Sequence, residues 1–279
     1  MLKQTHQVLL DDVNYAVNEY GSPTQKTLLL IHGLGWTKEL WRLIIEGLAD
    51  KYYLIIPDLS GHGSSSSINN FSFDKLCNHL LDMMAEFNIN HFDVIGSSLG
   101  ACLAIKIASL SSVKVDNLYL VDGGYYSIQD IPNIIWNDFV GEDMPESSFH
   151  DIQSYLDFMK SNDSLWNSEI ESAVRDQVTF NDDHSVTLKL SSVDKTNYLN
   201  EMWAFDPKMY VGKIQSKVHT IVALGEQEPK EMQAFKIHQA KSFDKHFMSS
   251  EVIIMHYTDH LVMLDKPKEF IQLINNAQI

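Results

Sequence analysis

Gly96-Ser97-Ser98-Leu99-Gly100 is the stretch that decides how the fold of this chain is interpreted. It follows the apolar segment 92–95 and opens a run of small residues with helical periodicity. A serine flanked by glycines in this context indicates a sharp strand-to-helix turn, with the serine oxygen exposed at the helix N-terminus. The glycines lack the Cβ atoms that would collide where strand and helix pass close together. The pattern also fits an ordinary glycine-flanked turn, so a catalytic role for Ser98 depends on the rest of the chain.

Length and composition indicate one large α/β domain, or such a domain with an insertion. The chain has 279 residues, of which 44% are hydrophobic, and this is enough to bury a substantial core. Cys77 and Cys102 have no spacing typical of zinc or of a disulfide framework, so we expect them to be core thiols. The N-terminal residues contain no long apolar stretch, and we therefore expect a cytoplasmic protein without a signal peptide or membrane span.

The charge of the chain favours a small-molecule substrate as its partner. A formal net charge of -16 would repel nucleic acid and anionic membranes, and no cluster of lysine or arginine offsets it. The loop Gly33-Leu34-Gly35 lacks the third glycine of a dinucleotide fingerprint, and the sequence contains no Walker phosphate loop. We therefore predict no cofactor and no metal, and we make no prediction of the oligomeric state.

Alternating apolar runs and helical patterns predict a doubly wound sheet. Six short apolar runs are typical of buried parallel strands and cover residues 27–31, 52–56, 92–95, 118–121, 218–224 and 252–255. Helical patterns separate most of them, at residues 40–48, 73–87, 99–110, 232–247 and 268–274. Two further stretches with period-two alternation, 6–10 and 13–20, predict an antiparallel hairpin at one edge.

The regular alternation stops after Asp122 and resumes near Val218, which leaves an interval too long for an ordinary crossover and too apolar for a linker. We therefore expect a core formed by residues 1–124 and 206–279, with a helical cap inserted over residues 125–205. The cap is acidic and rich in aromatic residues. We predict that four aromatic side chains bind the substrate, although the cap members could instead form the core of the cap: Trp36, Trp136, Phe139 and Trp203.

A loop at the end of the strand 27–31 is the candidate for one half of an oxyanion hole. Its sequence is His32-Gly33-Leu34-Gly35, and we predict that the Leu34 N–H is one donor. The second donor is the N–H of Leu99, the residue after the serine. Both donors are backbone groups. We expect His32 to be structural.

A serine nucleophile needs a base and an acid that orients it. His260 lies after the last predicted strand and is the predicted base, whereas His256 ends that strand and is the weaker competitor. A carboxylate after the preceding strand would accept the second ring N–H. Glu228 is the first choice, while Glu226 and Asp122 remain alternatives.

The order of these motifs resembles that of the α/β-hydrolase fold superfamily over nearly the whole chain apart from the cap. The segment 58–64 resembles the turn after the fourth strand in that family, and its His62 is structural there. His260 lies seven residues before Pro267, as in the usual ending of the family. The chain departs from the usual pattern of that family at two positions. Glu228 stands in the acid loop where aspartate is commoner, and Asp259 replaces the usual glycine before His260. The resemblance implies a mostly parallel eight-stranded sheet flanked by helices.

The resemblance also implies acyl transfer by a Ser98-His260-Glu228 triad through an acyl-enzyme. The expected substrate is an ester, thioester or lactone of a small, largely apolar molecule. A serine at the turn, rather than an aspartate, argues against haloalkane dehalogenases and epoxide hydrolases. Two alternatives stay open: a C–C bond hydrolase or lyase that uses the same triad, and a ligand-binding protein of this fold without catalysis.

Overall fold

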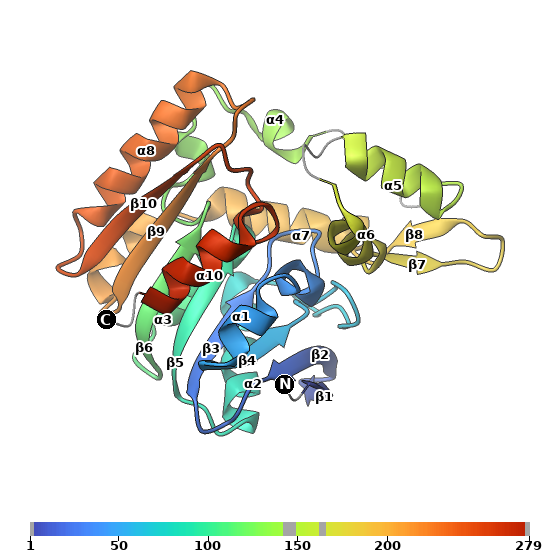
Figure 1. The fold of residues 1–279 in the computed structure, drawn as a ribbon, viewed down its shortest axis with the longest axis horizontal. Coiled ribbons are helices and arrows are strands. Elements are labelled where there is room, and N and C mark those ends of the chain that lie inside the picture. The colour runs from blue at the N-terminus through green and yellow to red at the C-terminus, as the bar shows by residue number, and fades with distance from the viewer. Residues whose placement is uncertain (1–2, 142–148, 162–165, 277–279) are drawn as a thin grey trace.

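The structure is a computed structural model that describes residues 3–141, 149–161 and 166–276. Its centre is an eight-stranded sheet with the order β1-β2-β4-β3-β5-β6-β9-β10 (Figure 1). The strands are β1 Lys3–Leu10, β2 Val13–Tyr20, β3 Lys26–Ile31, β4 Tyr52–Pro57, β5 His91–Ser97, β6 Lys114–Val121, β9 Lys217–Leu224 and β10 Ser250–His256. β1 pairs antiparallel with β2, β2 pairs antiparallel with β4, and all other neighbours are parallel. The predicted mostly parallel eight-stranded sheet with an edge hairpin is confirmed.

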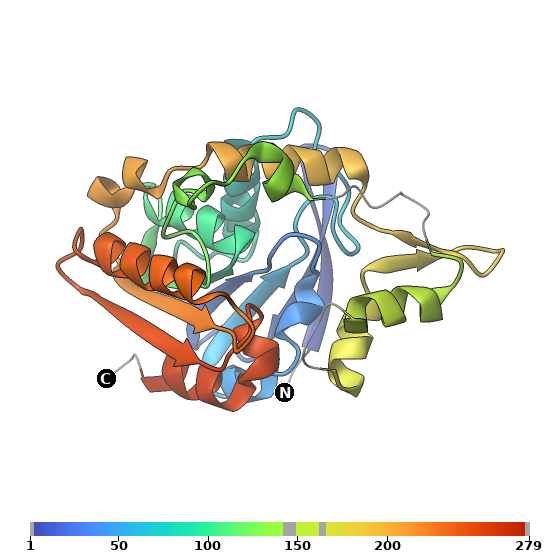
Figure 2. The ribbon, with the colours of Figure 1, turned by 90° about the horizontal axis from the view of Figure 1, so that it is seen from above.

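Helices cover both faces of this sheet (Figure 2). One face carries α2 (Phe73–Glu86), α3 (Leu99–Ala108) and α8 (Lys230–Asp244), and the other carries α1 (Ile45–Ala49), α9 (Val262–Asp265) and α10 (Pro267–Asn276). Each face has its own apolar cluster. In β3, Leu29 and Ile31 belong to one cluster, while Leu28 and Leu30 belong to the other. Because successive strand residues point to opposite faces, a continuous apolar run is buried on both sides.

The parallel strands bring the candidate functional loops to one edge of the sheet. β3, β5, β6 and β9 are consecutive neighbours and run in the same direction. The segments that follow them, beginning with His32, Ser98, Asp122 and Gly225, therefore lie together at their carboxyl ends. Ligands of open α/β sheets bind at this edge.

The segment between β6 and β9 leaves the sheet and returns to it. It contains the elements η2 Ile128–Asp130, α4 Trp136–Val140, α5 Ile152–Ser161, α6 Ser168–Arg175, β7 Val178–Phe180, β8 Val186–Leu188 and α7 Ser192–Ala204. α5, α6, β7 and β8 project from the core, and α7 runs back across it (Figures 1 and 2). Contacts with the core include the Tyr198 hydroxyl, which donates to Ser60 O at 2.9 Å. After α7, η3 (Pro207–Met209) and η4 (Val211–Lys213) lead to β9.

The segment expected to form a helical cap contains α4 to α7 and also an element that the sequence did not indicate, since β7 and β8 form a separate antiparallel hairpin. Each strand has only three residues, which is too short for a period-two pattern to stand out in the sequence. The turn between them is closed by a hydrogen bond from the Asn181 N–H to Ser185 O at 2.9 Å, and His184 adopts φ +70° within it.

The two cysteines and the helices bear on what the composition predicts. Cys77 and Cys102 are both buried free thiols, as predicted, and burial raises the pKa of each to about 12. Over the described residues, every helix is too short or too polar to cross a membrane.

Candidate active site

A strained turn holds Ser98 at the end of β5. The residue has φ +54° and ψ −115°, a conformation that residues with side chains rarely adopt. A Cβ atom on Gly96 would overlap the backbone of Gly100 in α3, and one on Gly100 would overlap Ile31 O. Only glycine fits at these two positions, which confirms the steric reason for the spacing. α3 begins at Leu99, so its N-terminus is directed at the serine.

Asp122 lies beside this turn because β6 runs next to β5. Ser97 is paired with Val121 in the parallel register, so the residues that follow the two strands emerge together. A Cβ on Gly123 would lie 2.7 Å from the Ser98 Cα, a distance that shows how closely the two turns pack. Asp122 has φ +45° and is a second strained residue at this edge.

His260 is hydrogen-bonded to Asp122. It lies in the loop between β10 and α9, and its Nδ1 is 2.7 Å from Asp122 Oδ2. When Nδ1–H donates to the carboxylate, Nε2 remains unprotonated, which is the form that a general base needs. The side chain of His260 is 51% exposed and that of Asp122 is 3% exposed. The competing His256 ends β10, as its place in the sequence indicates.

The prediction that Glu228 is the acid partner of His260 is wrong in this structure. The carboxylate on the histidine belongs to Asp122, the alternative, whereas Glu228 Oε1 lies 3.1 Å from Lys236 Nζ. β6 and β9 are adjacent, so an acidic residue after either strand reaches the same edge of the sheet. Glu226 is exposed in the same loop as Glu228.

Lys236 links the two carboxylates. Its Nζ is 2.9 Å from Asp122 Oδ1 and donates to both Glu228 and Ala223 O. Burial alone would raise the pKa of Asp122, but the hydrogen bond to His260 and the Lys236 ammonium together hold it below its ordinary value. Asp122 is therefore kept ionised, although it is buried.

Sequence reasoning missed Lys236, although a signal for it exists. The buried residues of α8 are Lys236, Ala240 and Phe243, which follow the spacing i, i+4 and i+7 of one helix face. A lysine on an apolar stripe needs a buried partner. A charged residue at that position in the helix after the acid loop therefore indicates a carboxylate beneath it.

We expect Lys236→Met to destabilise the fold by about 3 kcal/mol, because it leaves a buried carboxylate without its cation. The acid limb of the kcat/KM profile on an ester is expected to move to higher pH, since loss of the ammonium favours protonation of the Asp122–His260 pair. Urea unfolding and a pH–rate profile measure the two effects. Lys230→Met, at the exposed start of α8, is the matched control. An unchanged pH profile in a folded Lys236→Met protein would contradict this role.

The oxyanion loop is held by two buried histidines. Gly33 packs against the serine, since a Cβ built on it would lie 3.4 Å from Ser98 Cβ. The Gly35 N–H donates to His62 Nε2 at 3.1 Å, and the Leu59 N–H donates to His32 Nε2 at 2.9 Å. The other ring nitrogen, Nδ1, also lies close to a backbone carbonyl in each histidine. It is 2.8 Å from Gly33 O in His32 and 3.0 Å from Ser60 O in His62.

The expectation that His32 and His62 are structural is therefore confirmed. Both rings are buried and are bonded to the backbone of the loops that they join. Leu34 N–H and Leu99 N–H stay the predicted oxyanion donors, at the positions that this framework supports.

Because His32 and His62 are buried, we expect the protein to lose stability in mild acid. Burial lowers the pKa of His32 to about 4 and that of His62 to about 3, so the folded protein keeps both neutral. The unfolded chain protonates them near pH 6.5, and stability therefore falls as the pH drops below that value. From pH 7 to pH 5 we expect each to remove about 2 kcal/mol from the free energy of unfolding.

Urea unfolding at pH 7, 6 and 5 measures this loss. In His62→Gln, whose amide oxygen can accept the Gly35 N–H, the difference between pH 7 and pH 5 is expected to shrink by about half. A wild-type stability that does not change over this range would contradict the account of the two histidines.

A cavity of about 450 Å³ lies between the oxyanion loop and the cap. Its lining from the core includes Leu34, Gly35 and Trp36. The cap contributes α5, the β7–β8 hairpin and the start of α7, through residues Tyr155, Met159, Gln177, Thr187, Leu188, Leu190, Ser191, Ser192 and Lys195. A smaller cavity of about 330 Å³ borders Asp122, His260 and Glu228.

The structure separates the four aromatic residues that were predicted to bind substrate. Trp36 lines the larger cavity, whereas the other three form a cluster of their own and are absent from its lining. The ring centroid of Trp136 is 5.5 Å from that of Trp203, and Phe139 lies 5.7 Å from Trp203. These three side chains pack against one another between α4 and α7, and their contact with substrate stays a prediction.

The described residues bring no three His, Cys, Asp or Glu side chains together in a way that could hold a metal ion.

Comparison with known proteins agrees with this geometry. The model of the alpha/beta hydrolase fold family matches residues 26–277, and the chain belongs to that family. Among solved structures, the thioesterase domain from the curacin biosynthetic pathway is similar with a TM-score of 0.78 and 17% identity, over 99% of this chain and 100% of that one. E-2-(acetamidomethylene)succinate hydrolase is also similar, with a TM-score of 0.78 and 16% identity over 99% and 98% of the two chains. At such identities the likeness shows the fold.

A shorter match exists to the magnesium-chelatase 30 kDa subunit of Rhodobacter capsulatus. It is 35% identical over 98 residues, which are 34% of this chain and 34% of the relative. The chain thus matches about a third of the length of that relative.

Proposed function

We propose that the protein is a serine hydrolase that cleaves an ester, thioester or lactone of a small molecule. Ser98 is the nucleophile, His260 the base and Asp122 the acid partner. The observation that carries the proposal is the hydrogen bond from His260 to buried Asp122 beside a serine in a strained turn. The nucleophile, the base and the orienting carboxylate follow β5, β10 and β6, which run in parallel and end at the same edge of the sheet.

The proposed reaction proceeds in two halves. His260 Nε2 takes the proton of Ser98 Oγ as the oxygen attacks the substrate carbonyl carbon, and the Leu34 and Leu99 N–H groups hold the oxyanion. The histidine then gives its proton to the leaving alcohol or thiol, and an acyl-enzyme remains. Water, deprotonated by the same nitrogen, attacks the acyl carbon and releases the acid and Ser98.

Asp122 is suited to this cycle because it stays ionised. It fixes the tautomer of His260 and stabilises the imidazolium that forms in each half-reaction. The Lys236 ammonium, which keeps the pKa of Asp122 low, has no route to the substrate in this scheme and acts by positioning.

A substrate panel tests the proposed bond type. We expect 4-nitrophenyl acetate, an acyl thioester of similar size and a γ-lactone to be hydrolysed, and a vinylogous diketone to be left intact. Each substrate is measured with wild type and with Ser98→Ala. Cleavage of the diketone alone would favour the C–C hydrolase, and a folded protein that cleaves none of the four would favour the ligand-binding alternative.

A further inference from the structure

The cavity of about 450 Å³ between the oxyanion loop and the cap is lined by both apolar and polar groups. Next to the oxyanion loop it is lined by Leu34 and Trp36, and Leu188 of β8 adds to its apolar wall. Its polar lining includes Gln177, which directly precedes β7, and Lys195 in the first turn of α7. A substrate whose carbonyl oxygen accepts from the Leu34 N–H and whose acyl chain extends into this cavity would meet both the apolar wall and these polar groups.

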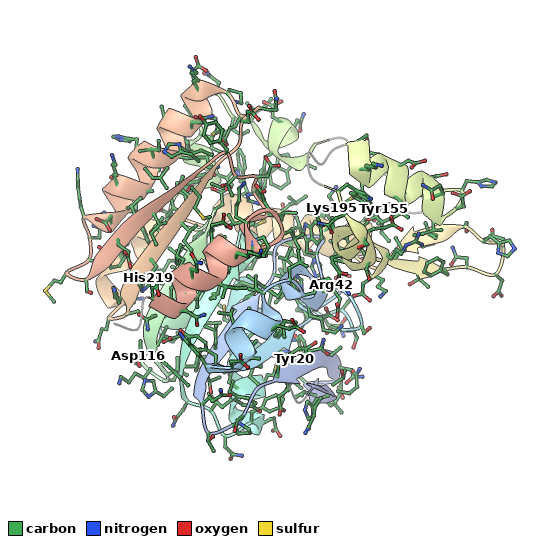
Figure 3. The ribbon with its side chains drawn as sticks, in the orientation of Figure 1. Tyr20, Arg42, Asp116, Tyr155, Lys195 and His219 are labelled. Atoms are coloured by element: carbon green, nitrogen blue, oxygen red, sulfur yellow. The ribbon has the colours of Figure 1, made fainter. Side chains whose placement is uncertain are left out.

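Lys195 brings a positive charge to the lining of this cavity. The side chains of Lys195 and Tyr155 lie together between the core and the projecting cap (Figure 3). Among the described residues, no carboxylate lies within ion-pair distance of the Lys195 ammonium. Asp194 accepts the hydroxyl of Ser191 at 2.8 Å, and Asp176 lies 3.5 Å from the ammonium of Lys189. The nearby acidic groups thus have other partners.

Gln177 supplies a second donor without a partner. The residue is 6% exposed, and its Oε1 accepts the Tyr155 hydroxyl at 2.5 Å. Its buried Nε2 has no hydrogen-bond partner among the described residues, and such a group costs about 1–3 kcal/mol unless a ligand satisfies it. The N-terminus of α7, which begins at Ser192, adds a favourable field for negative charge.

We propose that this cavity takes a substrate whose acyl chain ends in a carboxylate, such as a half-ester of an aliphatic dicarboxylic acid. The chain lies along the apolar wall, and the terminal carboxylate accepts from Lys195 Nζ and Gln177 Nε2. This inference names a substrate class and rests on the proposed function. The cap is acidic overall. Lys195 is the one positively charged group among the described lining residues, so it is the group that would attract an anionic substrate.

Binding to the Ser98→Ala protein tests the inference without turnover. The probes are monomethyl suberate, which is an anion, and dimethyl suberate, its neutral counterpart, both titrated calorimetrically at pH 7.5. We expect the anion to bind about tenfold more tightly, which is the size of one charge-assisted hydrogen bond. Lys195→Met, added to this protein, is expected to reduce the preference to within about twofold. Lys195→Arg is expected to retain most of it.

Lys160→Met is the matched control, because it removes one exposed positive charge from α5 of the same cap. It is expected to keep the tenfold preference. Gln177→Leu is expected to weaken binding of the anion several-fold. Equal binding of the two probes, or a preference that survives Lys195→Met in a folded protein, would overturn the inference.

Kinetics with two further esters separates this inference from the proposed function. Wild type is expected to prefer 4-nitrophenyl hydrogen suberate over 4-nitrophenyl methyl suberate in kcat/KM, and Lys195→Met is expected to lose this preference. Lys160→Met is expected to keep both the preference and wild-type activity on 4-nitrophenyl acetate. Hydrolysis of all three esters without a preference for the anion would overturn the inference and leave the proposed function standing. Selective binding of monomethyl suberate by a protein that hydrolyses no ester would support the inferred site and overturn the proposed function.

Discussion

Asp122→Asn is expected to lower kcat on a 4-nitrophenyl ester by about 10⁴-fold, whereas Glu228→Gln is expected to lower it by no more than about tenfold. An asparagine at position 122 keeps the size of the side chain but removes the charge. Its amide would let His260 adopt the wrong tautomer and would leave the imidazolium unstabilised. Glu228 is bonded to Lys236 and not to His260, so its loss disturbs a positioning contact.

The two variants form a matched pair, since each replaces a carboxylate by an amide on the same lysine. Circular dichroism and urea unfolding show whether each protein is folded before kcat is measured. A large loss of kcat in Glu228→Gln together with a small loss in Asp122→Asn would identify Glu228, in the loop after β9, as the acid partner. That result would contradict the assignment of Asp122.

Ser98→Ala is expected to lower kcat by about 10⁶-fold, because the nucleophile and the base act as one unit. His260→Ala is expected to have an effect of similar size, and the double variant to be no slower than either single one. Ester hydrolysis under saturating substrate measures all three. The neighbouring Ser97, which is buried in β5, offers a control in Ser97→Ala, for which we expect activity close to wild type. Losses that multiply in the double variant would show that the two side chains act independently.

The sheet and the serine turn were predictable because their causes are local. Runs such as 28–31 are apolar on both faces of the sheet. Glycines are needed on either side of Ser98 because the backbones of the strand and the helix pass very close together in such a turn. His260 was predictable from its place after the last strand. These inferences need only the order of elements along the chain.

The acid was not predictable in the same way. Asp122 and Glu228 follow adjacent strands, and the order of elements allows either to reach the histidine. The choice depends on side-chain contacts across 114 positions of sequence, between Asp122 and Lys236. The position of Lys236 on the buried face of α8 indicates a buried carboxylate, but it does not choose between Asp122 and Glu228, because the lysine contacts both.

The cap was predicted least well for a similar reason. Its short hairpin has no strong period, and the packing of α4 on α7 takes Trp136 and Trp203 away from the cavity. The residues that replace them in the lining, such as Gln177 and Lys195, are polar and have no distinctive pattern in the sequence.

Reaction with a fluorophosphonate, followed by mass mapping of the adduct, shows whether Ser98 is an activated nucleophile, because only an activated serine reacts quickly with this reagent. We expect one adduct on the peptide that contains Ser98, and no labelling in either Ser98→Ala or His260→Ala. A folded wild-type protein that stays unlabelled, or that is labelled at another serine, would contradict the assignment of Ser98 as the nucleophile.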